Sequence, residues 1–206
     1  MSTLDSIVRQ AADTAHFARG YLDYLSGLLR RLNTKAIADF IAELELARSN
    51  ANTVFVVGNG GSAATASHMA NDFGVGAHPT DGSPPYRVMA LSDNVAAMTA
   101  IANDTGYANL FVYQLRIHYR LGDKLIAISA SGNSPNIVEA ARWVKRRGGR
   151  VIGLVGFDGG ELKRLSDVVI HAETPKDEYG PVEDVHMILD HLVYTWLKSR
   201  RLTNPG

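Results

Sequence analysis

The chain has 206 residues with 46% hydrophobic and 20% charged side chains, a composition that predicts one globular α/β domain with a substantial core. Its formal net charge of zero argues against nucleic acid or an anionic membrane surface as a partner, and no apolar run approaches the roughly 20 residues that span a bilayer. The absence of cysteine excludes disulfides and thiolate metal sites. Because the N-terminus also lacks a signal-peptide pattern, we expect a cytoplasmic protein.

The N-terminal part of the chain predicts two amphipathic helices ahead of the first strand. Apolar residues recur at intervals of three and four over 4–32, which predicts one long helix, and Thr34 is the expected N-cap of a second. The apolar faces of such helices must be covered by the chain's own sheet or by another subunit. We therefore predict a single domain over residues 1–206, in which 1–50 form a helical oligomerisation segment and 51–201 form an α/β core.

Farther along, short apolar runs alternate with amphipathic segments. Strands are predicted at residues 53–57, 87–90, 124–128, 150–155 and 168–171. Helices are predicted at residues 62–73, 94–103, 109–119, 135–147, 161–165 and 181–201. Strands separated by helices are typical of parallel pairing with crossover connections. The predicted fold class is α/β, a doubly wound five-stranded parallel sheet with flavodoxin-like layering and N-terminal helices.

A glycine turn, Gly58-Asn59-Gly60-Gly61-Ser62, follows the first predicted strand and leads into a helix. Its glycines permit positive φ angles and a close approach of the backbone to a ligand, and Ser62 is the expected N-cap. A helix N-terminus offers unpaired N–H groups and a positive dipole end, so this turn could hold a phosphate. The alternative is a tight strand-to-helix turn without a ligand.

A second turn of similar construction, Ser129-Ala130-Ser131-Gly132-Asn133-Ser134, follows the strand at 124–128, and Pro135 then suits the first turn of a helix. If the two strands are neighbours in a parallel sheet, both turns lie at its carboxyl edge, where ligands bind. We then expect hydroxyl and amide donors to hold a phosphate, because neither turn contains a lysine or arginine. The alternative is two polar turns without a shared ligand.

Histidines and carboxylates gather on two of the predicted helices. His68 and Asp72 are four residues apart and therefore share one helix face. The last helix carries Glu183, Asp184, His186, Asp190 and His191. Glu183 and His191 are about 12 Å apart along its axis, so they share an ion only if Glu183 reaches along the helix. Such ligands suit zinc or another divalent ion, and the alternatives are a surface His–Asp pair and a polar cluster without metal.

Together these stretches resemble the sugar isomerase (SIS) family, and within it the phosphoheptose isomerase branch. The resemblance covers about residues 50–197 and rests on the two turns, His68 with Asp72, Ala100-Ile101-Ala102-Asn103-Asp104, Gly122-Asp123, and Val185-His186 through His191. It implies that the phosphate is bound by Ser62, Ser129, Ser131 and Ser134, with substrate contacts from Asn59, Gly60, Gly61, Ala130 and Glu183. It implies a metal at His68, Asp72, Glu183 and His191, and catalytic roles for Asp72, His191 and Asp104.

The resemblance also implies a homotetramer with active sites at subunit interfaces, one zinc or other divalent ion per subunit, and conversion of sedoheptulose 7-phosphate to D-glycero-D-manno-heptose 7-phosphate through an enediol. Four positions depart from the family pattern: Asp72 replaces glutamate, Glu183 replaces glutamine, Thr65 replaces aspartate and Ala130 replaces a frequent threonine. The alternatives are a non-catalytic SIS protein of the type that associates with the replication initiator DnaA, and a phosphosugar sensor. The two histidines favour the isomerase over the adaptor.

Overall fold

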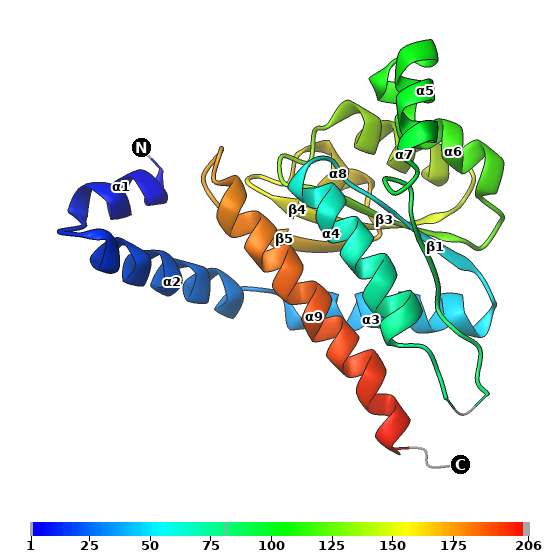
Figure 1. The fold of residues 1–206 in the computed structure, drawn as a ribbon, viewed down its shortest axis with the longest axis horizontal. Coiled ribbons are helices and arrows are strands. Elements are labelled where there is room, and N and C mark those ends of the chain that lie inside the picture. The colour runs from blue at the N-terminus through cyan, green and yellow to red at the C-terminus, as the bar shows by residue number, and fades with distance from the viewer. Residues whose placement is uncertain (1, 81, 204–206) are drawn as a thin grey trace.

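The computed structural model describes residues 2–80 and 82–203 and has a five-stranded, all-parallel sheet at its centre (Figure 1). The strands are β1 (Thr53–Val57), β2 (Arg87–Ala90), β3 (Lys124–Ser129), β4 (Arg150–Gly156) and β5 (Val168–Ala172). Their order across the sheet is β2-β1-β3-β4-β5, so the direction of winding reverses between β1 and β3. This order confirms the predicted doubly wound sheet, and in such sheets ligands generally bind at the carboxyl edge where the winding reverses.

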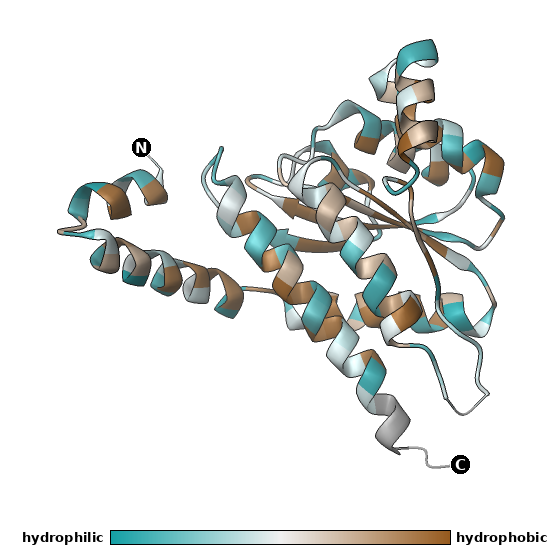
Figure 2. Cartoon of the chain, in the orientation of Figure 1, coloured by the Kyte–Doolittle hydropathy of each residue, from teal (hydrophilic) through white to brown (hydrophobic). Residues whose placement is uncertain are grey.

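Helices cover both faces of the sheet (Figures 1 and 2). One face packs against α3 (Thr34–Ser49), α4 (Gly61–Met69) and α9 (Tyr179–Thr203). The other packs against α5 (Val95–Thr105), α6 (Leu110–His118), α7 (Pro135–Lys145) and α8 (Gly160–Leu165). All six residues of β3 are buried. A parallel strand covered on both faces is largely apolar, as the four central residues of β3 are, and such runs are recognisable in the sequence.

The chain begins with two helices instead of the single one predicted over 4–32. These are α1 (Thr3–Gln10) and α2 (Thr14–Arg30). Asp13 causes the break, because its backbone is extended and its carboxylate accepts the His16 N–H at 2.7 Å, which caps a new helix. The apolar spacing continues across this break, so periodicity alone did not reveal it.

Two predicted N-caps are also wrong. Asn33 caps α3 in place of Thr34, through a side-chain oxygen that accepts two backbone N–H groups. The residue before α4 is Gly60, with φ +53°, while Ser62 lies inside the helix and is 5% exposed. Positive φ is open to glycine at little cost, so the turn tightens at Gly60 and the helix begins earlier than predicted.

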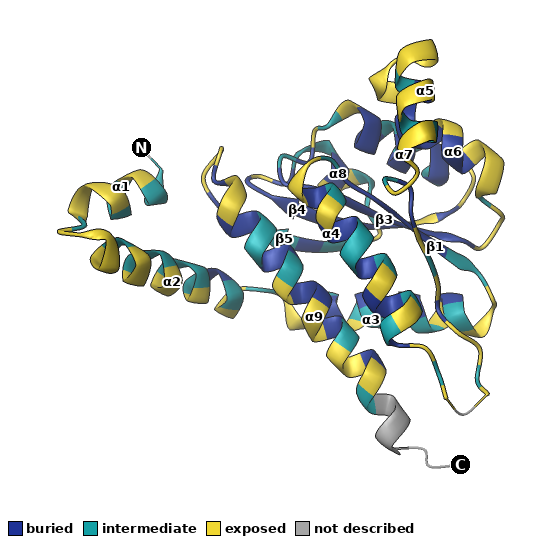
Figure 3. Cartoon of the chain, in the orientation of Figure 1, coloured by how far each residue is buried: buried dark blue, intermediate teal, exposed yellow. Residues whose placement is uncertain are grey.

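The N-terminal helices project from the sheet (Figure 1), and most of their residues are exposed or half-buried (Figure 3). Glu178, which is 1% exposed, anchors them to the start of α9. Its carboxylate accepts the Thr3 N–H at 2.6 Å, the Leu4 N–H at 3.1 Å and the Tyr24 hydroxyl at 2.5 Å. None of the helices in the described part of the chain combines the length and apolar character needed to cross a membrane.

Candidate functional site

The two polar turns lie side by side at the carboxyl edge of the sheet, as predicted, because β1 and β3 are neighbours. The Asn59 side-chain amide exchanges hydrogen bonds of 2.8 and 2.9 Å with that of Asn136 on α7, and its oxygen also accepts the Tyr107 hydroxyl. The sequence analysis missed Asn136, which is 1% exposed. Its partner is 77 residues away, so only the tertiary structure reveals the bridge between the turns.

The hydroxyl groups of the second turn face one another. Ser129 Oγ donates to Ser134 Oγ at 3.2 Å and lies 3.5 Å from Ser131 Oγ. Gly132, with φ +63°, reverses the chain so that these hydroxyls meet. Ser134 is the N-cap residue of α7, yet its side chain makes no capping hydrogen bond. The three hydroxyls therefore remain oriented toward one another, where a phosphate could accept hydrogen bonds from them.

Glu183 lies over the first turn. A Cβ atom on Gly61 would overlap the Glu183 carboxylate, so the absence of a side chain there permits the contact. Burial, and then the charge of Asp184, raises the pKa of Glu183 above its usual range. His68 follows Gly61 by seven residues on the same helical segment, which corresponds to about 10 Å along the axis. The structure therefore places Glu183 beside the glycine turn at residues 58–62.

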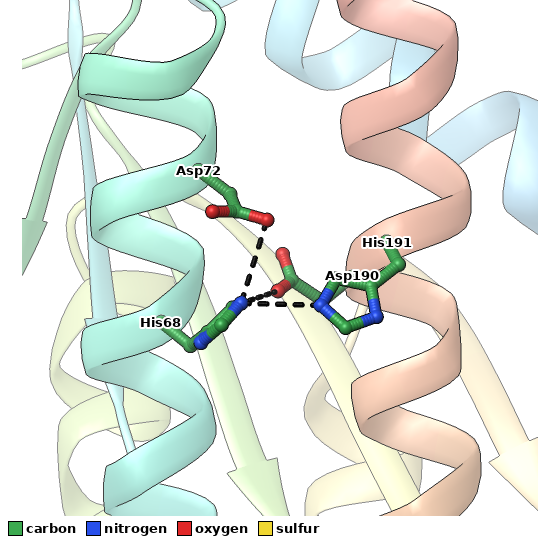
Figure 4. A group of neighbouring side chains, drawn as sticks. All are labelled: His68, Asp72, Asp190 and His191. Carbon is green, nitrogen blue, oxygen red and sulfur yellow. Dashed lines mark hydrogen bonds and ion pairs between the residues drawn. The ribbon is translucent and has the colours of Figure 1, made fainter.

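Four side chains converge between α4 and α9, as Figure 4 shows: His68, Asp72, Asp190 and His191. Each offers one ligand atom, and these atoms all lie within 4.8 Å of one another. His68 Nε2 is 3.1 Å from His191 Nε2, 3.5 Å from Asp72 Oδ2 and 3.6 Å from Asp190 Oδ2. Three of the four residues predicted to bind metal are in this cluster, and Asp190 joins them instead of Glu183.

Local helix geometry explains how the cluster forms. Asp72 lies in a π-helical turn, η1 (Ala70–Gly76), which continues α4 and extends beyond the predicted helix end. Such turns are frequent at functional sites, because the extra residue redirects nearby side chains. Asp190 and His191 are consecutive and diverge by about 100° around α9. The family resemblance implied only His191 as a metal ligand. In the structure both reach the space beside α4.

Asp190 is the most deeply buried member of the cluster. Its residue is 0% exposed, and neither carboxylate oxygen has a hydrogen-bond partner among the described residues. Burial, and then the charge of Asp72, raises the pKa of Asp190 to about 7. Asp72 is less isolated, since the Asn71 amide donates to its other oxygen at 3.1 Å. One ligand oxygen of each carboxylate therefore lies within 4.8 Å of the other, and His68 Nε2 lies close to both.

Other predicted site residues lie outside this cluster. Asp104 is exposed on α5, where it accepts a hydrogen bond of 2.8 Å from Asn103. Ala130 is buried in the second turn, and its carbonyl accepts the Gly156 N–H at 2.9 Å. Ser62 is buried in the first turn of α4. The roles of these residues in catalysis and in phosphate binding remain predictions.

The buried His186, one turn before Asp190 on α9, predicts acid sensitivity. Burial lowers its pKa to about 4 from 6.5, although a backbone contact with Val155 opposes the shift. In the unfolded chain His186 binds a proton near pH 6.5, whereas in the folded chain it does so only near pH 4. The contribution of His186 to the free energy of unfolding is therefore fully present above pH 6.5 and is lost as the pH drops toward 4. We expect a loss of roughly 3 kcal/mol from this group.

Urea unfolding of metal-free protein between pH 7 and pH 4 would measure this loss. The His186 contribution is the difference between the wild type and His186→Gln, because glutamine does not titrate. Protonation of Asp190, whose pKa is raised to about 7, stabilises both proteins as the pH falls and cancels in this difference. Identical pH dependences in the two proteins would contradict the assignment.

Comparisons with known proteins identify related chains. The SIS domain family model matches residues 20–156. The chain is 37% identical to a phosphoheptose isomerase of Aneurinibacillus thermoaerophilus over 81% of its own length and 78% of that protein. It is 32% identical to a probable phosphoheptose isomerase of Thermoplasma acidophilum over 89% of its own length and 98% of that protein.

Among solved structures, the chain is similar to the phosphoheptose isomerase of Neisseria gonorrhoeae, with a TM-score of 0.77, 29% identity, and coverage of 90% of this chain and 96% of that one. The phosphoheptose isomerase of Francisella tularensis has a TM-score of 0.78 at 23% identity, covering 91% of this chain and 99% of that one, which supports the fold.

Proposed function

The chain belongs to the SIS domain family, and we propose that it is a sugar-phosphate isomerase of the phosphoheptose isomerase type. Its substrate in this proposal is sedoheptulose 7-phosphate and its product is D-glycero-D-manno-heptose 7-phosphate. The relatives that carry this name match most of the chain, and the fold is shared with the solved structures of two other phosphoheptose isomerases.

The observation that carries the proposal is the position of α4. Its first residues belong to the glycine turn beside the serine hydroxyls, and His68, about 10 Å farther along the axis, belongs to the histidine and carboxylate cluster. An extended seven-carbon sugar phosphate has a comparable length. A phosphate held by the turns would therefore place the opposite end of the sugar near the cluster.

The proposed reaction moves a proton between adjacent carbons through an enediol, which requires a base, an acid and stabilisation of charge on the two oxygens. Asp72 and His191 are the candidates to take and return the proton, and Asp104 is a further candidate. Ser62, Ser129, Ser131 and Ser134 bind the phosphate, and the Asn59–Asn136 bridge holds the two turns in register.

The fold family implies a divalent metal, and the donor set fits one. The unpartnered oxygens of Asp190 and the facing imidazole nitrogens of His68 and His191 leave several lone pairs directed at one point. Two nitrogen and two oxygen donors without sulfur suit zinc or a similar borderline ion. When bound, such an ion would polarise the carbonyl and hydroxyl oxygens of the sugar. We propose one ion per subunit.

The proposed phosphate site predicts that sugar phosphates stabilise the protein. Sedoheptulose 7-phosphate at saturating concentration should raise the melting temperature by mass action. Ser131→Ala and Ser134→Ala should each weaken the affinity about 10- to 100-fold, because each removes one hydrogen bond to a charged group. Differential scanning fluorimetry measures the shift, and Ser49→Ala, at the end of α3, is the control that should match the wild type. An unchanged melting temperature with every sugar phosphate would contradict this ligand class.

Turnover separates the isomerase from a phosphosugar sensor and from a non-catalytic adaptor. Purified protein loaded with zinc should convert sedoheptulose 7-phosphate to the aldose. Reduction with borodeuteride places deuterium on C-1 of the aldose but on C-2 of the ketose, and fragmentation in the mass spectrometer locates the label. Binding without conversion would favour the sensor, and neither binding nor conversion would favour the adaptor. The proposal also assigns the enzyme to the reducing cytoplasm, with which the absence of cysteine agrees.

We also propose a homotetramer, because apolar side chains remain exposed on the helices around the sheet. Leu22 on α2 is 61% exposed, and Trp196 on α9 is 52% exposed beside an apolar groove formed with Ile37 and Ile41 of α3. Light scattering at micromolar concentration should give four times the mass of the chain. Leu22→Asp and Trp196→Asp should lower that mass, because burying a carboxylate without a partner is unfavourable. A wild-type monomer would contradict the prediction.

A further inference from the structure

Two carboxylates of α9, those of Asp190 and Glu183, lie against the α4 segment in different surroundings. Asp190 is fully buried, and both of its oxygens lack hydrogen-bond partners among the residues that the structure describes. A buried carboxylate in this condition is unfavourable unless a cation accompanies it. Among the described residues, Asp190 has an ion-pair contact with His68 Nε2 at 3.6 Å, which is too long for a hydrogen bond.

The spacing of the donor atoms matches a shared ion. Ligands about 2.0–2.1 Å from a tetrahedral zinc ion are separated from one another by about 3.3 Å. From His68 Nε2, the distances to donor atoms of His191, Asp72 and Asp190 are 3.1, 3.5 and 3.6 Å. All four side chains point toward the same space between the two helices (Figure 4).

The charges also balance with a divalent ion. Two carboxylates and two neutral imidazoles would neutralise the cation. Without it, the fully buried Asp190 carboxylate offers a ligand atom within 4.8 Å of that of Asp72. The Asn71 amide donates to Asp72, whereas neither oxygen of Asp190 has a donor within the described part of the chain.

Glu183 has no comparable geometry. Its carboxylate lies against Gly61 at the N-terminal end of α4, about 10 Å along the axis from His68. Glu183 is not among the four side chains whose ligand atoms lie within 4.8 Å of one another. Glu183 instead faces the end of the site where the phosphate turns meet the substrate.

We propose that the fourth protein ligand of the divalent ion is Asp190 and that Glu183, the position indicated by the family resemblance, lies outside the metal site of this chain. The inference rests on the proposed metal-containing isomerase. If Asp190 binds the metal, Glu183 is available to contact the substrate. The metal and the substrate then bind different carboxylates of α9.

The test is zinc uptake by chelator-treated protein, followed by metal analysis and competition titration in the absence of substrate. Asp190→Asn should weaken zinc binding by at least about a hundredfold, more than the loss of a supporting residue beyond the ligands. Glu183→Gln should bind zinc as the wild type does, while its turnover changes. Asp184→Asn is the matched control, because that carboxylate lies on the same helix and bonds Tyr21 at 2.5 Å instead of facing the cluster.

Thermal stability gives a second readout that a folding defect cannot imitate. In metal-free protein, Asp190→Asn should raise the melting temperature, because it removes an unpaired buried charge, and zinc should then add no further stabilisation. Loss of zinc in Glu183→Gln with retention in Asp190→Asn would overturn the proposal, as would a wild-type protein that takes up no divalent ion. Zinc binding at Asp190 without isomerase turnover would refute the proposed function and leave this site standing.

Discussion

Replacing His191 by alanine is expected to lower kcat for sedoheptulose 7-phosphate by at least about a thousandfold, because general acid–base catalysis alone contributes roughly 10²- to 10⁴-fold. The imidazole is a proton-transfer candidate, and its Nε2 lies 3.1 Å from that of His68. The change also removes one proposed metal ligand, so zinc content should fall together with turnover. Steady-state kinetics and metal analysis on the same preparation measure both effects.

His118→Ala is the matched control for this prediction. His118 is exposed at the end of α6, on the opposite face of the sheet from the cluster, and its loss should leave kcat unchanged. Far-UV circular dichroism should show that both variants fold. If His191→Ala keeps more than a tenth of the wild-type kcat, the cluster is not the reaction centre.

Replacing Glu43 by alanine is expected to destabilise the fold by about 3–5 kcal/mol, the usual result of removing one partner from a buried ion pair. Glu43 of α3 binds Lys124 at 2.9 Å and the Arg150 guanidinium at 2.5 and 2.9 Å. Burial alone would raise the pKa of Glu43, but the hydrogen bonds from Arg150 and Lys124 outweigh it and hold the pKa below its usual range. Lys124 is 6% exposed, so its ammonium would be left buried without this counter-charge.

Urea unfolding at pH 7 measures this loss, and an exposed pair on the same helix provides the comparison. Lys35 and Asp39 are 2.8 Å apart with side chains 80% and 48% exposed, so Asp39→Ala should cost less than about 1 kcal/mol. Glu43 lies beside the amino ends of β3 and β4, opposite the polar turns, so the folded variant should retain its turnover. A similar loss in both variants would show that Glu43 contributes as a surface charge only.

The sequence predicted most of the fold because the relevant signals are local. Strands buried on both faces have apolar central residues, and turns rich in glycine or serine follow β1 and β3. All five strands lie where they were predicted, with ends shifted by at most one residue. The break at Asp13 and the caps at Asn33 and Gly60 were missed, since several neighbouring residues satisfy the same capping preferences.

For the site, the sequence by itself determined the two polar turns and the pairing of His68 with Asp72, because residues four apart on a helix share a face. Only the tertiary structure decided which part of α9 meets that pair. The two helices align so that Asp190 and His191 face His68, while Glu183 meets Gly61 two turns earlier. The relative position of two packed helices depends on side-chain contacts distributed along both of them, and no short stretch of sequence encodes it.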